Sequence, residues 1–170
     1  IILLLIISAC GTGSEDAYFN QILDDEWSRG MDENPVYASY MGDKSANQDW
    51  PDISEQSVRK RQKKTREALE RIKSINPQKL SKDNQLNYRL FLYNYERSVK
   101  SQNFDSHLLT FGQRGVIQLA QETAEGLSFN SAQDYKDWLV RLDKLPELIN
   151  AHIGLGKLGI ERSITAPKIL

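Results

Sequence analysis

The fold of this chain is decided by residues 82–101, which read KDNQLNYRLFLYNYERSVKS. At 100° per residue this stretch forms a helix that carries two apolar stripes on opposite sides. The stripes consist of Leu86, Leu90 and Tyr93 on one side and of Tyr88, Leu92, Tyr95 and Val99 on the other. A helix that is apolar on two sides is sandwiched between neighbours. We therefore expect residues 82–101 to lie between other helices.

Helical signals continue on both sides of this stretch. Ser81 can cap it, and Asn76-Pro77 separates it from a helix that Ser54 can cap and that runs to about Ser74. That earlier helix has a single apolar stripe, formed by Val58, Thr65, Leu69 and Ile72. Further helices are expected over residues 15–33, 36–41, 115–125 and 131–143 and from Pro146 onward. Only the residues from Ser163 onward leave a strand open, so the sequence predicts an all-α fold.

The ends of the last helices carry specific signals. Ser131 with Asp134 resembles a capping box, and Pro146 suits the first turn of the helix that follows. The later part of that helix contains three glycines, Gly154, Gly156 and Gly159. Such glycines either cost about 1 kcal/mol each in a free helix or mark a close backbone contact with another element.

The start of the chain indicates export. The apolar run Ile1–Ile7 is followed by Ser8, Ala9, Cys10 and Gly11. The run is too short to span a bilayer, which takes roughly 20 apolar residues, but it matches the apolar core of a secretion signal. A small residue before a Cys at the end of such a core is typical of a bacterial lipoprotein signal, in which Cys10 becomes the lipidated first residue. The alternative is a piece of an ordinary signal peptide or membrane anchor.

This reading divides the chain into three parts. Residues 1–10 are a lipoprotein signal remnant that ends at the lipidated Cys10, residues 11–14 form a flexible tether, and residues 15–170 form a helical region. No Met precedes Ile1, so we expect that the chain was cut from a longer reading frame. Gly11 stands where similar lipoproteins retained at the inner membrane have Asp. The expected location is the outer membrane, facing the periplasm, where the source has two membranes.

Composition restricts the classes of partner and bond. The formal net charge is −1, from 22 basic and 23 acidic side chains, which argues against a nucleic-acid binder because such a protein carries a basic face. Cys10 is the single cysteine, so the part after it cannot form a disulfide. The expected partner is a membrane, reached through the lipid anchor.

Residues that could carry chemistry are scarce. His107 lies in a polar loop and His152 within an apolar helix, and neither has a second His or a Glu at the spacing of an H-E-x-x-H motif. Isolated histidines of this kind are usually loop or interface residues without a metal. The sequence also lacks a G-x-S-x-G elbow and a phosphate-binding glycine loop. We predict no catalytic, cofactor-binding or metal-ligating residue in this chain.

Two clusters of charge have alternative interpretations. The basic cluster consists of Arg59, Lys60, Arg61, Lys63, Lys64 and Arg66. It could face anionic lipid head groups, but Glu67 lies four residues from Lys63 and from Arg71, and Glu70 lies four after Arg66. This spacing favours pairing along a solvated helix. The acidic cluster consists of Asp24, Asp25, Glu26, Asp32 and Glu33, for which a solubilising face is favoured over an acid/base set because no His accompanies it.

Several segments resemble the bacterial "domain of unknown function 885" family. They are ENPVYASYMGD at residues 33–43, WPDIS at 50–54 and LSKDNQLNY at 80–88. The stretch from Tyr135 to Leu170 is also similar, with Arg141-Leu142, Leu145-Pro146, Gly159-Ile160 and Ile164-Thr165-Ala166-Pro167. One departure is Ser163, where the family commonly has Gly.

This resemblance implies properties that the residues alone do not show. Members resemble helical zinc metallopeptidases of the zincin kind, are several times longer than this chain and are often exported lipoproteins. Their H-E-x-x-H motif and a downstream glutamate ligand lie far beyond the equivalent of Leu170. Zinc and a peptide substrate are therefore implied for the full-length protein, and none of the catalytic residues is expected in this chain.

Two hypotheses remain. In the first, the chain is the N-terminal helical part of a larger zincin-like, lipid-anchored peptidase and forms one wall or the roof of a substrate cleft. In the second, it is a self-contained helical lipoprotein that acts as a binding or scaffold module. The first predicts that part of the surface formed by Tyr88, Leu92, Tyr95 and Val99, or by the helix around Leu155 and Leu158, packs against chain after Leu170.

Overall fold

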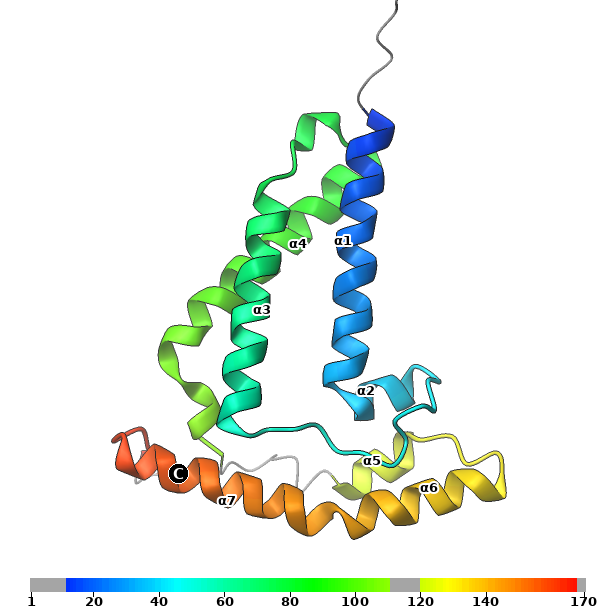
Figure 1. The fold of residues 1–170 in the computed structure, drawn as a ribbon, viewed down its shortest axis with the longest axis vertical. Coiled ribbons are helices and arrows are strands. Elements are labelled where there is room, and N and C mark those ends of the chain that lie inside the picture. The colour runs from blue at the N-terminus through cyan, green and yellow to red at the C-terminus, as the bar shows by residue number, and fades with distance from the viewer. Residues whose placement is uncertain (1–11, 111–119, 168–170) are drawn as a thin grey trace, which may run out of the picture.

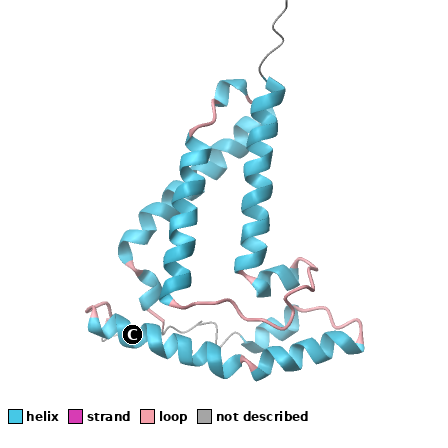
Figure 2. Cartoon of the chain, in the orientation of Figure 1, coloured by secondary structure: helices cyan, strands magenta, loops and turns pink. Residues whose placement is uncertain are grey.

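The chain is built from helices, as the sequence predicted. A computed structural model describes residues 12–110 and 120–167, and within these ranges it contains helices and loops and no strand (Figure 2). Residues 163–167, where a strand was left open, form none. No described helix is both long enough and apolar enough to cross a membrane. The α-helices are α1 (Thr12–Glu33), α2 (Pro35–Tyr40), α3 (Glu55–Lys73), α4 (Lys82–Ser101), α5 (Ala120–Gly126), α6 (Ala132–Asp143) and α7 (Leu145–Glu161).

The helices form an open frame. Helices α1, α3 and α4 meet at one end, and α1 and α3 diverge from there (Figure 1). The other end is a base in which α6 and α7 lie end to end. Lys144 is both the last cap of α6 and the first cap of α7, and its helical backbone angles (φ −86, ψ −4) explain why the two helices continue in nearly the same direction.

Helix starts follow the caps predicted from the sequence. The Oγ atoms of Ser54 and Ser81 accept hydrogen bonds from backbone amides three residues on, at 3.3 and 3.4 Å. Ser131 and Asp134 form a complete capping box. Because each bond joins residues within one turn, local sequence is enough to fix these starts.

Helix α1 begins earlier than expected. It starts at Thr12, so residues 12–14, predicted as part of a flexible tether, form its first turn instead. The reason is that the next residues are held by a distant segment. Glu15 accepts a hydrogen bond from the amide of Asn76 at 2.6 Å, and Asp16 accepts one from the amide of Ser81 at 3.0 Å. A turn next to a fixed helical segment forms easily, since propagation costs less than nucleation.

The main core lies where α1, α3 and α4 meet. It consists of Phe19, Ile22, Ile72, Ile75, Leu80 and Tyr88, with Leu23, Phe91, Leu92 and Tyr95 packed against them. The predicted stripe of α3 is confirmed at its C-terminal end, where Leu69 and Ile72 are buried. The core is formed by the described chain itself.

The two apolar faces of α4 differ in burial. Of the stripe formed by Tyr88, Leu92, Tyr95 and Val99, Tyr88 belongs to the core of the described chain, and Leu92 and Tyr95 pack against it and are partly buried. Tyr88 is thus not open to chain after Leu170, and a contact with the partly exposed remainder of the stripe stays a prediction. The opposite stripe is the exposed one, with Leu86, Leu90 and Tyr93 at 51%, 55% and 56% of their full exposure. The pattern had identified both faces, but only the tertiary structure shows which one α1 and α3 cover.

Helix α7 is buried on one side only. Leu155, around which an external contact was expected, is 6% exposed and faces the described chain, whereas Ile153 and Ile160 of the same helix are exposed. A contact of α7 with chain after Leu170 stays a prediction. A Cβ added at Gly159 would lie 2.8 Å from the carbonyl oxygen of Ile164 and 2.9 Å from that of Leu108. The predicted close backbone contact is therefore confirmed at Gly159, whereas a Cβ at Gly154 would meet nothing within 4 Å.

The basic cluster of α3 mostly pairs with other elements. Lys63 pairs with Glu67 at 3.6 Å, as the spacing predicted. Arg71, however, contacts Asp25 of α1 at 2.6 Å, and Arg66 donates to Gln102 rather than to Glu70. The prediction of pairing within the helix was thus wrong for these two arginines, because partners from α1 and from the end of α4 come within reach.

Candidate functional site

The residues singled out from the sequence do not form a site. Cys10 lies outside the described residues. His107 lies in a 3₁₀ turn at Ser106–Leu108, and His152 lies within α7. Within residues 12–110 and 120–167 no three His, Cys, Asp or Glu side chains are grouped closely enough to hold a metal ion. The described residues therefore do not fit the zinc centre that the family resemblance implies.

Both histidines are held as neutral side chains. Nδ1 of His107 lies 3.8 Å from Oδ1 of Asp105, and its Nε2 is buried without a hydrogen-bond partner among the described residues. Burial lowers the pKa of His107, and the positive charge of Arg59 lowers it further. Both ring nitrogens of His152 are likewise buried without a described partner, and burial lowers its pKa. These are packing histidines that resist protonation.

A buried arginine joins the base of the frame to the segment after α2. Arg141 of α6 is fully buried and donates from Nη2 to Oγ of Ser39 and to the carbonyl oxygen of Ala46, both at 2.9 Å. Its guanidinium lies 5.8 Å from the ring centroid of Trp50, whose Nε1 donates back to the carbonyl oxygen of Arg141 at 2.7 Å. Burial lowers the pKa of Arg141. Nη2 alone makes the side-chain hydrogen bonds of this tie, since Nε and Nη1 of Arg141 are buried without a hydrogen-bond partner among the described residues.

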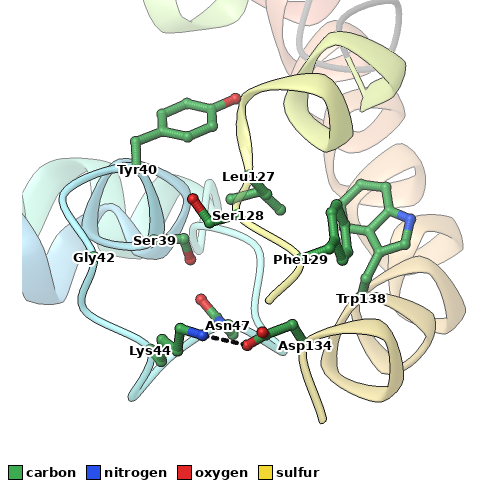
Figure 3. Close-up of a pocket in the computed structure, with 10 residues that line it drawn as sticks. All are labelled: Ser39, Tyr40, Gly42, Lys44, Asn47, Leu127, Ser128, Phe129, Asp134 and Trp138. Carbon is green, nitrogen blue, oxygen red and sulfur yellow. Dashed lines mark hydrogen bonds and ion pairs between the residues drawn. The ribbon is translucent and has the colours of Figure 1, made fainter. Parts of the chain in front are cut away.

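A small cavity lies beside this tie (Figure 3). Lys44 pairs with Asp134 at its edge, and Ser39 and Phe129 also line it. The ammonium group of Lys44 and the hydroxyl of Ser131 lower the pKa of Asp134 to about 2. The volume is 60 Å³, whereas ligand pockets measure roughly 300–1,000 Å³. We therefore assign this cavity to the structural junction and not to a substrate.

Two larger hollows lie along α1 and α3, and a third, of 310 Å³, lies between the segment around Trp50 and the start of α7. One, of 480 Å³, is lined by Asp24, Asp25, Glu26 and Asp32 of α1 and by Lys64 and Arg71 of α3. A second, of 310 Å³, is lined by Asp32 and Lys64 as well, together with Asp49, Trp50 and Lys60. Because Asp32 and Lys64 line both, the two hollows adjoin and form one cleft. We call it the α1–α3 cleft.

A charged network fixes the wall of the α1–α3 cleft. Arg29 donates to Glu33 at 2.7 Å and to Glu26 at 3.0 Å, and the hydroxyl of Tyr95 from α4 donates to the same Glu26 carboxylate. Lys64 of α3 lies 3.6 Å from Glu33. Burial, and then the hydrogen bond to Glu26, raise the pKa of Tyr95. Burial opposes charge on Arg29, but Glu26 and Glu33 outweigh it and raise the pKa of Arg29. Tyr95 therefore stays neutral and Arg29 charged at neutral pH.

The side chains of the α1–α3 cleft are suited to binding a polar ligand. Its walls offer carboxylates, an ammonium group and guanidinium groups, which suit a polar ligand that carries both signs of charge. Among the described residues that line the cleft there is no His or Cys, and the serines are Ser28 and Ser57. The hydroxyl of Ser57 donates to a carboxylate oxygen of Asp52. The arrangement of charges supports binding.

The sequence did not predict this cleft. The acidic cluster was interpreted as a solubilising face, which is wrong for Asp25, Glu26 and Glu33, because each pairs with a basic side chain. Asp24 and Asp32 are exposed, as expected. The pairing of Glu33 with Lys64 joins residues on different helices and has no signal in local spacing.

Comparison with known proteins gives one match. A family model described as "Bacterial protein of unknown function (DUF885)" matches residues 35–170. No curated protein and no solved structure matches the chain. The matched range contains α2, the Trp50 segment and α6, which form the buried junction around Arg141. The resemblance predicted from these segments is confirmed, and the chain belongs to the DUF885 family of bacterial proteins of unknown function.

Proposed function

We propose that this chain is the N-terminal helical region of an exported, lipid-anchored, zinc-dependent metallopeptidase. In this role it builds part of the substrate cleft, and the zinc ligands and catalytic residues belong to chain beyond Leu170. Membership of the DUF885 family supports the proposal through the zincin-like character that the family resemblance implies. Zinc would supply the activated water for peptide hydrolysis when bound.

The observation that carries the proposal is an exposed apolar stripe along the base of the frame. Its most exposed members are Tyr135, Leu139, Ile153 and Ile160, at 58%, 60%, 39% and 68% of their full exposure. With Leu142, Pro146 and Ile149 between them, the residues from Tyr135 to Ile153 follow a spacing of three and four, and Ile160 lies seven residues further along α7. Such spacing places side chains on one face of a helix, and an apolar face of this length is typical of a contact with another helix.

The α1–α3 cleft gives this region a direct part in substrate binding. A peptide backbone and its termini present donors, acceptors and both signs of charge, which the cleft's acids and bases can meet. In the proposed enzyme the cleft would hold substrate residues that lie away from the bond to be cleaved. Changes there should act on KM and leave kcat nearly unchanged, because this contact is equally strong in the ground state and the transition state.

The test uses the full-length protein that extends beyond Leu170. We expect hydrolysis of peptides that a zinc chelator abolishes and that added zinc restores. In that protein Lys64→Ala and Asp32→Ala should raise KM several-fold, and Lys157→Ala on the exposed side of α7 is the matched control. A full-length protein without chelator-sensitive peptidase activity would refute the proposal and favour the self-contained helical module.

Lipid anchoring is proposed at Cys10. Expressed with a complete signal, the protein should partition with membranes and take up labelled fatty acid, and Cys10→Ala should abolish the labelling. With Gly11 after the lipidated residue, the proposed location is the outer membrane, facing the periplasm. Labelling that survives Cys10→Ala contradicts the anchor without affecting the peptidase proposal.

A further inference from the structure

The outer face of α4 has the pattern of a helix that pairs with a helix. Leu86, Leu90 and Tyr93 follow each other at spacings of four and three, and Asp83 and Arg97 extend the same line at either end. All five side chains are exposed. The buried Tyr88 and the partly buried Leu92 lie on the opposite side of α4 and pack in the core with residues of α1 and α3. We call the exposed line the α4 seam.

The charges along the α4 seam are arranged with opposite signs at its two ends. Asp83 lies at the start of the helix and Arg97 and Lys100 near its end, while Arg89 and Glu96 lie together along one border of the seam. Arg97 stacks on Tyr93, with 5.5 Å between the guanidinium carbon and the ring centroid. No side-chain hydrogen bond or ion pair joins Asp83, Arg89, Glu96 or Lys100 to another described residue.

We propose that the α4 seam is a self-association surface, on which two copies of this chain pair through antiparallel α4 helices. When Leu90 of one copy packs against Tyr93 of the other, Asp83 of each copy faces Lys100 of the other. The same register brings Arg89 of each copy against Glu96 of the other. In this one register the apolar side chains of the two copies pack together, and the dimer pairs four acidic side chains with four basic ones.

The same residues disfavour a parallel pairing of two α4 helices. In register, it would place Asp83 against Asp83 and Arg97 against Arg97. Like charges at such positions disfavour an arrangement, and charges at the borders of a helix pair select partner and orientation. The charge pattern therefore identifies a second, antiparallel copy as the occupant. The inference does not depend on peptidase activity.

The expected dimer is weak, because the apolar centre has three side chains per copy. Its affinity should fall with added salt, since the pairs are exposed. Each change at Arg89 or Glu96 occurs twice in the dimer. Arg89→Glu replaces two attractions with two repulsions, and Glu96→Arg does the same, so each should weaken the dimer by about tenfold or more.

The experiment is sedimentation equilibrium of the full chain in density-matched detergent at low salt. The wild type should show a monomer–dimer equilibrium, which Arg89→Glu and Glu96→Arg each shift to monomer. An equimolar mixture of these two variants should form a heterodimer, because glutamates at 89 and 96 of one copy then face arginines of the other. Lys157→Glu on α7 is the matched control and should leave the equilibrium unchanged.

Three results would overturn the inference. The first is a wild-type chain that stays monomeric up to about 100 μM. The second is a dimer that neither charge reversal weakens, which would place the contact on another face. The third is a pair of monomeric variants that do not associate when mixed, which would exclude this register. Circular dichroism of each variant verifies that the exposed substitutions leave the helices intact.

Discussion

Two glycines of the same helix should respond in opposite ways to the same substitution. In α7, Gly154 is exposed and a Cβ added there meets nothing within 4 Å. Gly159 is buried, and a Cβ there would lie 2.8 Å and 2.9 Å from two carbonyl oxygens. Both oxygens belong to backbone, on Ile164 and Leu108, and cannot move aside as a flexible side chain can.

The magnitudes follow from helix propensity and packing. Replacing Gly by Ala in a helix interior stabilises by about 0.5–1 kcal/mol, so Gly154→Ala should raise the free energy of unfolding by that amount. Gly159→Ala has the same propensity gain but adds an overpacking cost of about 1–3 kcal/mol. Since Leu108 is itself buried against α7, we expect the cost to exceed the gain and Gly159→Ala to be destabilising.

The assay is thermal unfolding followed by circular dichroism at 222 nm. For a chain of this size 1 kcal/mol corresponds to about 2–4 °C in Tm. The two variants should therefore move Tm in opposite directions and differ from each other by several degrees. Equal increases in Tm for both would refute the close approach of α7 to Leu108 and Ile164.

Three further predictions concern titration and the buried tie. Asp134→Asn should lower Tm at pH 7 but not at pH 2. The folded pKa of Asp134 is about 2, below its ordinary 3.8, so its carboxylate stabilises the fold above pH 4 and loses this effect as the pH falls toward 2. Wild-type stability in urea should decline as the pH drops below about 6.5, where His152 protonates in the unfolded chain but not in the folded one, and His152→Leu should reduce this decline. Trp50→Phe should cost about 1 kcal/mol in urea unfolding, since it removes the indole donor from the carbonyl oxygen of Arg141, which keeps only the amide of Lys144 at 3.2 Å. No change in the urea midpoint would contradict that role.

The features that sequence predicted correctly depend on interactions within a turn. Ser54, Ser81 and Ser131 cap helices through bonds to amides three residues away, so the signal and its cause lie in the same short segment. The boundary between the helices expected over residues 15–33 and 36–41 is of the same kind, because Pro35 disfavours helical geometry at Asn34, which separates α1 from α2. Gly159 could also be interpreted from the sequence, because a glycine inside a helix is costly and often marks a close contact with another element.

The features of the candidate site depend on residues far apart in the chain. Lys64 reaches Glu33 and Arg71 reaches Asp25 because α1 and α3 lie side by side at one end and diverge at the other. The spacing rule within α3 predicted other partners, since it considers one helix at a time. The α1–α3 cleft could not be predicted for the same reason.

The sequence by itself determined that the chain is helical, where most helices start and end, and which family it belongs to. Only the tertiary structure decided which apolar face of α4 is buried and that Arg141, a charged residue, lies fully inside. The physical reason is one of range. Capping and helix periodicity act between residues within a turn, whereas burial depends on which elements meet, and Arg141 is buried by Ser39, Ala46 and Trp50 from a segment about ninety residues earlier.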